Sequence, residues 1–335
     1  MPLPQKYLRS WEQRRNARQT DQVHHHKTSR VQIICMTWRF LLSAALVSSA
    51  GLAWGQQMAV TFDDLPVHGA MPPGMTRLEI AQSILDTLKR EKLPPVYGFV
   101  NGGRGADDPS SLTVLQAWRA AGQPLGNHTW AHLDMNEETA DQFGAEVSRN
   151  QPLLESLMGR ADWRWLRYPY LHEGDTVEKR RAARAWLFAH RYKIAEVSMD
   201  FEDYLWNAPY ARCVAKHDNA SIQKLHDTYL AVADQYYGVS RELSQLLYRR
   251  DVKYVLLMHV GAFDARMLPE LLALYRAKGL KFISLPDAMS DPAYQDDPDI
   301  GEPSGGTILE LLMQKKKITF PPNTKPYKEL EAMCR

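Results

Sequence analysis

An α/β fold on a parallel sheet is predicted by the way strand-like and helix-like segments alternate along this chain of 335 residues. From residue 57 onward, short runs of β-branched or aromatic residues are separated by amphipathic stretches of about 12 to 20 residues. Strands that are separated by helices are typical of a parallel sheet, either open or closed into a barrel. Since no internal repeat or low-complexity linker interrupts the pattern, we expect one domain.

The individual elements are predicted from apolar periodicity and from turn residues at their ends. The predicted strands lie at 58–61, 96–100, 124–126, 163–168, 192–197, 254–258 and 281–284. The predicted helices lie at 76–91, 110–121, 137–158, 176–190, 220–250 and 266–278. From residue 291 to the C-terminus we expect a tail rich in Pro, Gly and Asp, with one short helix at 307–315, that either wraps the domain or stays partly loose.

The first 55 residues differ in character from the rest of the chain. Residues 1–35 carry seven Lys and Arg against two acidic residues, and an uncharged apolar run of 14 residues follows at 40–53. Such a run is short for a membrane span but suits the core of a signal peptide, and small residues stand at its end, at positions 53 and 55. We therefore predict a signal peptide at 36–55, preceded by an upstream extension at 1–35; a buried core helix is the structural alternative.

The signal peptide predicts an exported protein, periplasmic or secreted, that has no stable membrane insertion after cleavage. An uncleaved N-terminal membrane anchor is the alternative. Nothing in the sequence specifies an oligomeric state.

The apparent positive charge of the chain is a property of this leader. The whole sequence has 41 Lys and Arg against 39 Asp and Glu, whereas the 280 residues after the leader have 33 against 37, a net charge of −4. No aromatic–basic interleaving and no nucleic-acid-binding module is present, so we expect no nucleic-acid partner. Two of the three cysteines, Cys213 and Cys334, follow the leader and could pair in an oxidising compartment.

Adjacent carboxylates follow the first predicted strand, at Asp63 and Asp64. In a parallel barrel the carboxyl ends of the strands form the active face. Two carboxylates this close resist joint ionisation unless a cation neutralises one of them. For this pair alone, caps of a turn or helix before Leu65-Pro66 are an equally good interpretation.

Two histidines with a spacing of four, His128 and His132, follow the third predicted strand. Residues at this spacing share one face of a helical turn and can hold one metal ion. Two histidines with one carboxylate form a catalytic zinc set that leaves a coordination position open for water. The Asp63-Asp64 pair supplies that carboxylate and a second one that can act as a base.

Arg167 and Tyr170 follow the fourth predicted strand. Arginine stays protonated, so beside a carboxylate base it would orient that base and hold its pKa down. Pro169 restricts the backbone before Tyr170, whose amide could then act as an oxyanion donor. Taken alone, this segment is better explained by a surface arginine and a core aromatic residue.

His259 directly follows the sixth predicted strand, and Asp203 follows the fifth. A carboxylate that accepts a hydrogen bond from one ring nitrogen favours the protonated form of a histidine, which can then serve as an acid. Asp203 is the candidate partner for His259, although a lone histidine at a strand end is more often a satisfied core residue.

Taken together, these segments resemble the motifs of the polysaccharide deacetylases, the NodB-homology or carbohydrate esterase family 4 group. The motifs occur in the family's order over residues 58–287: Thr61-Phe-Asp-Asp64, His128-Thr-Trp-Ala-His132, Arg167-Tyr-Pro-Tyr170, Asp200-Phe-Glu-Asp-Tyr204 and Leu257-Met-His259. The resemblance implies a distorted (β/α)7 barrel at 56–290, with an insertion at about 205–250. It also implies one divalent metal, most often Zn²⁺, and an acetylated carbohydrate or peptidoglycan substrate.

The resemblance also implies a role for each residue. Asp64, His128 and His132 would be the metal ligands. Asp63 would be the general base, oriented by Arg167. His259 would be the general acid, tuned by Asp203. The backbone of Tyr170 would bind the oxyanion.

Two departures from the family pattern concern the substrate. Leu171-His-Glu-Gly174 replaces the glycine that commonly follows the tyrosine, and the 205–253 segment is unusually long. We expect His68 and His172, which lie beside motifs, to contact substrate; a structural role is the alternative for each. An O-acetyl esterase, a cyclic-amide hydrolase and a non-catalytic carbohydrate-binding protein are the alternative functions.

Overall fold

The computed structural model describes residues 56–66, 68–104, 106, 108–319 and 325–335. They belong to one compact unit that comprises residues 53–335. The upstream extension expected at 1–35 and the signal peptide expected at 36–55 lie outside the described residues. No helix in the described part of the chain combines the length and the apolar character that crossing a membrane requires.

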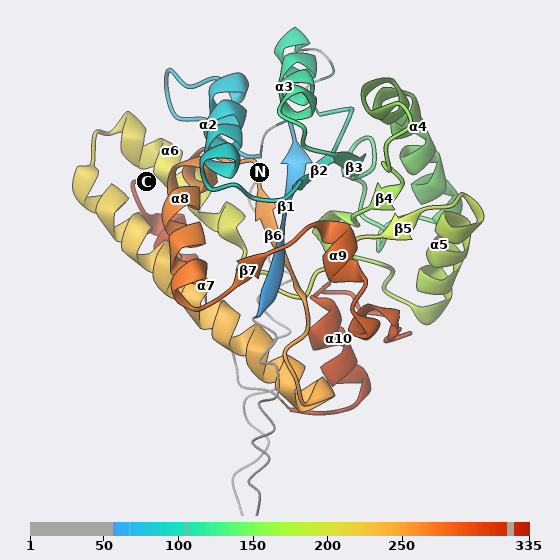
Figure 1. Ribbon diagram of the computed structural model, residues 1–335. Coiled ribbons are helices and arrows are strands. Elements are labelled where there is room, and N and C mark those ends of the chain that lie inside the picture. The colour runs from blue at the N-terminus through green and yellow to red at the C-terminus, as the bar shows by residue number, and fades with distance from the viewer. Residues whose placement is uncertain (1–55, 67, 105, 107, 320–324) are drawn as a thin grey trace, which may run out of the picture. The chain divides into compact units, whose positions relative to one another are not determined.

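A parallel sheet forms the centre of the unit, with helices around it (Figure 1). Its strands are β1 (Gln57–Leu65), β2 (Tyr97–Val100), β3 (Leu125–Asn127), β4 (Trp165–Leu166), β5 (Lys193–Ile194), β6 (Tyr254–His259) and β7 (Lys281–Phe282). The order is β5-β4-β3-β2-β1-β6, and β7 pairs with the first two residues of β1. All seven predicted strands are therefore present, in a parallel sheet as expected.

The sheet is curled, and the segment after β5 links its two ends. The amides of Ser198 and Met199 donate to the carbonyl of Val255 in β6, and Met199 forms an isolated parallel bridge with Leu256. This crossing explains why β5 is two residues long instead of the six expected, since the backbone leaves β4 to reach β6. In a regular seven-stranded barrel β7 would pair with β6 and continue the strand order. Here β7 pairs with β1 instead.

An outer ring of helices covers the sheet, each packed against its neighbour (Figure 1). Its members are α5 (Val177–Ala189), α4 (Ala140–Met158), α3 (Pro109–Ala120), α2 (Arg77–Arg90) and α8 (Ala262–Ala277). Thr76 and Thr139 begin α2 and α4 with capping boxes, in which the hydroxyl accepts from an amide three residues on. These caps and the buried apolar faces explain why the helices were predictable.

The long segment after the fourth motif folds into two helices, α6 (Asn207–Ala215) and α7 (Asn219–Tyr248). The long helix expected at 220–250 is thus confirmed, whereas α6 was not foreseen. Cys213 in α6 forms a disulfide with Cys334, across a Cα–Cα distance of 5.2 Å. The two cysteines that follow the leader therefore do pair, and the bond ties the end of the chain to α6.

The C-terminal residues pack on the domain rather than staying loose over the described part. The short helix α10 (Ile308–Lys315), expected at 307–315, packs against α7, and α11 (Tyr327–Ala332) packs against α6. The remaining elements are α9 (Leu285–Met289) and three 3-10 turns, η1 (Pro169–Leu171), η2 (Asp203–Trp206) and η3 (Pro292–Gln295).

Candidate metal centre and active site

The adjacent carboxylates lie inside β1, not after it. β1 continues to Leu65, so the expectation that the strand stops before Asp63 is wrong. The pairing with β2 shifts register between Phe62 and Leu65, and Asp64 has a positive φ of 64°. A bulge of this kind redirects side chains at the edge of a site. Because of the bulge, the side chains of both Asp63 and Asp64 can lie at the carboxyl-terminal edge of the sheet.

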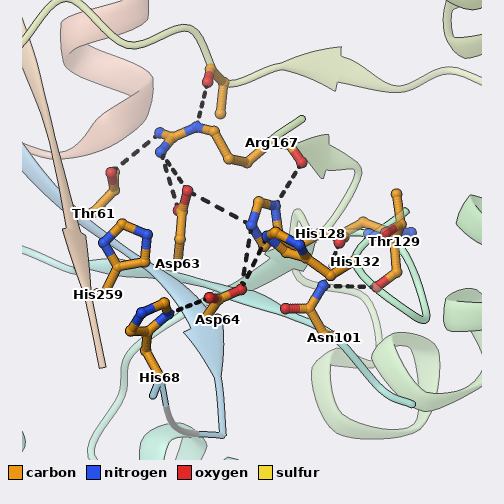
Figure 2. A network of polar contacts seen from close by, with 12 residues as sticks. Thr61, Asp63, Asp64, His68, Asn101, His128, Thr129, His132, Arg167 and His259 are labelled. Carbon is orange, nitrogen blue, oxygen red and sulfur yellow. Dashed lines mark hydrogen bonds and ion pairs between the residues drawn. The ribbon is translucent and has the colours of Figure 1, made fainter. Parts of the chain in front are cut away.

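Asp64, His128 and His132 converge on one point (Figure 2). Oδ1 of Asp64 lies 3.6 Å from Nε2 of His128 and 3.4 Å from Nε2 of His132. The Nδ1 atom of His128 lies 2.8 Å from the carbonyl oxygen of Arg167, which leaves its Nε2 facing Asp64. Oδ1 of Asp64 is buried and has no hydrogen-bond partner among the described residues. An unpartnered buried carboxylate oxygen between two imidazoles fits a cation ligand.

The charge states of these three residues also suit a divalent metal. Burial lowers the pKa of His128 well below its usual range and that of His132 to about 4. Burial alone would raise the pKa of Asp64, but its hydrogen bond with His68 and nearby positive charges hold it well below its usual range. Near pH 7 the group is therefore one carboxylate with two neutral imidazoles, the donor set that Zn²⁺ prefers.

Three asparagines hold the histidine loop against the sheet, and none was foreseen. Nδ2 of Asn101 donates to the carbonyl of His128 at 2.5 Å, and Nδ2 of Asn150 donates to Oδ1 of Asn127 at 3.1 Å. Oδ1 of Asn127 also accepts from the amide of Thr129. All three asparagines are buried, so they fix the backbone that carries both imidazoles. The one sequence signal is a polar residue directly after an apolar strand, as at Asn101.

Asp63 and Arg167 form a buried pair beside the three convergent residues. Nη1 of Arg167 donates to both oxygens of Asp63, at 3.0 and 3.2 Å. The guanidinium also donates to Thr61 and to the carbonyl of Ala195, so its position is fixed. Burial raises the pKa of Asp63 to about 6, against the opposing charge of Arg167. Asp63 is thus a carboxylate that can accept a proton near neutral pH.

His259 faces Asp63 across the pairing of β1 with β6. The ring Nδ1 of His259 lies 2.8 Å from Oδ1 of Asp203, and its backbone amide donates to Oδ2 of Asp203 at 2.6 Å. Asp203 is fully buried, and burial raises its pKa well above the usual range. The pair predicted from the sequence is therefore brought together, with Nε2 of His259 left to face the site.

A second buried carboxyl, Asp264, lies behind Asp203 and was not foreseen. The hydroxyl of Tyr229 donates to its Oδ1 at 3.0 Å, and Nδ2 of Asn207 donates to its Oδ2 at 2.6 Å. Asn207 and Tyr229 come from α6 and α7. The inserted helices therefore help to support the Asp203–His259 pair from behind.

The three remaining predicted residues differ in their distance from this centre. His68 lies next to it, since its Nδ1 is 2.5 Å from Oδ2 of Asp64 and its ring is 4.7 Å from that of His259. Tyr170 packs its ring 4.4 Å from that of His132, and its side chain is 56% exposed. His172 lies one ring farther out and is buried, with Nδ1 2.8 Å from Oδ1 of Asp134. This placement favours the structural alternative for His172, whereas its substrate contact stays a prediction.

Comparison with known proteins finds a family match over part of the chain. Residues 54–186 match the family model described as polysaccharide deacetylase. The match covers less than half of the chain, and over these residues the chain is similar to the polysaccharide deacetylases. The matched residues include the Asp63-Asp64 pair, both histidines and Arg167, but end before Asp203 and His259. The positions of those last two residues therefore rest on the geometry described above.

Two curated relatives are similar to this chain over part of their length. A peptidoglycan-N-acetylglucosamine deacetylase of Bacillus cereus is 25% identical over 148 residues, which cover 44% of this chain and 46% of the relative. A chitin deacetylase of Colletotrichum lindemuthianum is 26% identical over 159 residues, which cover 45% of this chain and 54% of the relative. The match thus spans about half the length of each relative.

The fold is also similar to a solved structure. The chitin deacetylase of Colletotrichum lindemuthianum superimposes with a TM-score of 0.50 at 21% sequence identity, covering 71% of this chain and 88% of that one. This chain therefore shares its fold with that structure.

Proposed function

We propose that this protein is an exported, metal-dependent hydrolase that removes N-acetyl groups from amino-sugar polymers or peptidoglycan. The observation that carries the proposal is the arrangement at the carboxyl-terminal edge of the sheet. There, a buried and unpartnered oxygen of Asp64 faces two neutral imidazoles, and an Arg-paired carboxylate and an Asp-paired imidazole lie on adjoining strands. Each of these groups has a distinct use in amide hydrolysis.

Asp64, His128 and His132 would hold the metal, which we take to be Zn²⁺ from its preference for this donor set. When bound, the ion would supply Lewis acidity to the acetyl carbonyl and to the attacking water. Asp63 would accept the proton of that water, since its pKa of about 6 makes it ionised and weakly basic near neutral pH. Arg167 would act as a positioning residue that fixes the Asp63 carboxylate.

His259 would donate a proton to the leaving amine of the sugar. Its Nδ1 is engaged by Asp203, so Nε2 is the atom left to deliver the proton. The backbone amide of Tyr170 would stabilise the negative charge that develops on the acetyl oxygen. Its positive φ of 59° places this residue in a rare backbone conformation, as is common where a backbone group serves a site.

The substrate class is proposed from the relatives and from one exposed aromatic side chain. The two curated relatives are named for N-acetylglucosamine in peptidoglycan and for chitin. The half-exposed ring of Tyr170 stands beside His132 and offers an apolar face to a sugar ring. Acetylated amino sugars therefore fit both observations, and we expect His68, at the same opening, to contact them.

Export is proposed from the sequence and from the disulfide. A bond between Cys213 and Cys334 is typical of proteins that fold in an oxidising compartment. It agrees with the signal peptide predicted at residues 36–55, and both support a periplasmic or secreted location.

Acetate release from N-acetylglucosamine oligomers and from peptidoglycan tests the function. The full chain is stripped of metal with a chelator, and activity is measured before and after Zn²⁺ is added back. We expect activity that requires the metal, and an Asp64→Asn variant that binds no Zn²⁺ and releases no acetate. The matched control is Arg241→Gln. It removes a surface arginine that pairs with Asp251 and is not part of the proposed site. If the zinc-loaded protein released no acetate from any acetylated sugar, the proposal would be wrong.

A further inference from the structure

The two oxygens of the Asp64 carboxylate have different surroundings. Oδ1 faces His128 and His132 and has no hydrogen-bond partner among the described residues. Oδ2 has two partners, Nδ1 of His68 at 2.5 Å and Nη1 of Arg104 at 2.7 Å. One oxygen is therefore open to a cation, whereas the other is already bound by a positive charge.

Asp64 also belongs to a second group with the composition of a metal site. The ligand atoms of Asp64, His68 and His259 lie within 4.8 Å of one another, as do those of Asp64, His128 and His132. Nδ1 of His259 is held by Asp203, an arrangement that presents Nε2 in the way that metal-binding histidines commonly do. By composition alone, the site could hold two ions that share the Asp64 carboxylate.

Arg104 opposes the second of these ions. Its guanidinium contacts Oδ2, the Asp64 oxygen that lies against Nδ1 of His68 and so on the side of the second group. Asp63, the other nearby carboxylate, is committed to Arg167. Among the described residues, a second ion would therefore find two imidazoles, no carboxylate oxygen without a cationic partner and a fixed positive charge at contact distance, which is electrostatically unfavourable.

The position of Arg104 is set by a tight turn after β2 rather than by chance contact. The amide of Gly103 donates to the carbonyl of Trp130, and the amide of Arg104 donates to that of Asn101. A Cβ on Gly103 would lie 2.6 Å from the indole nitrogen of Trp130, so the turn packs closely against the histidine loop. The side chain of Arg104 is 35% exposed, so it reaches Asp64 from the open side of the site.

We propose that Arg104 restricts the site to a single metal ion and so keeps the imidazole of His259 free to act as the acid. The guanidinium holds Oδ2 of Asp64, which blocks the Asp64–His68–His259 group and reserves Oδ1 for the ion between His128 and His132. An ion in the second group would take Nε2 of His259, the atom that has to carry the proton. This inference rests on the proposed metal-dependent function and adds a determinant of metal stoichiometry to it.

Zinc titration of the metal-stripped full chain tests the proposal. By isothermal titration calorimetry, we expect one equivalent of Zn²⁺ for the unmodified protein and for Arg104→Lys, which keeps the charge. Arg104→Gln should bind two equivalents, and excess Zn²⁺ should inhibit its acetate release at concentrations at least tenfold below those that affect the unmodified protein. Adding His68→Ala to Arg104→Gln should remove the second equivalent and leave the first. Arg241→Gln, at a surface Arg–Asp pair, is the matched control and should bind one.

The outcomes separate this inference from the function on which it rests. The contrary result is that Arg104→Gln binds one equivalent of Zn²⁺, releases acetate as fast as the unmodified protein and is no more sensitive to excess Zn²⁺. That result would overturn the role of Arg104 and leave the hydrolase proposal intact. Two equivalents for the unmodified protein would also overturn it. No bound zinc and no acetate release would contradict the proposed function itself. Thermal melts establish that each variant is folded, and Arg104→Ala replaces Arg104→Gln if the latter is not.

Discussion

Arg167 donates hydrogen bonds to both carboxylate oxygens of Asp63, although 104 residues separate the two in the sequence. The pair is buried, and the same guanidinium is held by Thr61 and by the carbonyl of Ala195. Arg167 therefore fixes both the direction and the charge of Asp63, and a change at either residue has a defined consequence.

Arg167→Met should leave Asp63 as a buried carboxylate without a partner. Breaking a buried ion pair from one side costs about 3–5 kcal/mol, so we expect a free energy of unfolding lower by that amount in urea denaturation. The turnover of acetylated substrate should fall by at least about 100-fold, since the proposed base loses its orientation. Arg241→Gln, at a surface pair, should change the free energy of unfolding by less than about 1 kcal/mol. A stable and active Arg167→Met variant would contradict the positioning role.

Asp63→Asn should abolish turnover while the metal stays bound. An amide cannot accept the proton of the attacking water, so we expect kcat to fall by about 10²–10⁴-fold. The three convergent ligand atoms belong to other residues, so the zinc content should match that of the unmodified protein. Loss of zinc from this variant, measured by elemental analysis, would mean that Asp63 rather than Asp64 is the ligand.

Asp203→Asn should slow the reaction without affecting zinc content or KM. Both oxygens of Asp203 accept from His259, one from the ring and one from the backbone amide. An asparagine can accept at one position only and places a donor against the other, so the imidazole loses its orientation. We expect kcat to fall by about 100-fold. If KM changed instead and kcat did not, Asp203 would have a structural role alone.

Replacing both Cys213 and Cys334 by serine should destabilise the protein without altering the site. The disulfide closes a loop between residues that are 121 apart, and loss of a native disulfide typically costs about 2–5 kcal/mol. We expect the urea midpoint of the variant to match that of the reduced unmodified protein, and zinc affinity to be unchanged. Equal midpoints for the oxidised and reduced unmodified protein would contradict this prediction.

Ionisation of Glu196 should make the folded protein less stable as the pH rises through neutrality. Burial, together with the neighbouring carboxylate of Glu173, raises the pKa of Glu196 from 4.5 to about 7, although Arg184 donates to both carboxylates. Between pH 4.5 and about 7, Glu196 therefore keeps its proton in the folded state and has lost it in the unfolded state. Stability from this group is full below pH 4.5 and is lost as the pH rises through about 7.

Glu196→Gln stays neutral and serves as the comparison for that prediction. Between pH 5 and 7, the free energy of unfolding of the unmodified protein should fall more steeply than that of the variant, by at most about 1.4 kcal/mol per pH unit. Urea denaturation at pH 5, 6 and 7 measures both slopes. Parallel slopes would show that Glu196 is ionised in both states.

Much of the site could be predicted because parallel strands end at one edge of a sheet. Residues at the carboxyl ends of these strands, such as Asp63, His128 and Arg167, must then lie along one edge of the sheet whatever the details of the loops. The helices were predictable for a related reason, since Thr76 and Thr139 cap amphipathic stretches whose apolar spacing is local. Caps and apolar spacing depend only on a few neighbouring residues, so they can be recognised in the sequence itself.

The sequence by itself thus determined the parallel α/β class, the segments of the chain that form the strands and the residue types at their carboxyl ends. Only the tertiary structure decided which oxygen of Asp64 is left open, that Arg104 binds the other, that His172 turns toward Asp134 and that Cys213 meets Cys334. The physical reason is that these outcomes depend on a register shift in one strand and on contacts between residues far apart in the chain. Neither the register shift nor the long-range contacts produce a periodic or local pattern in the sequence.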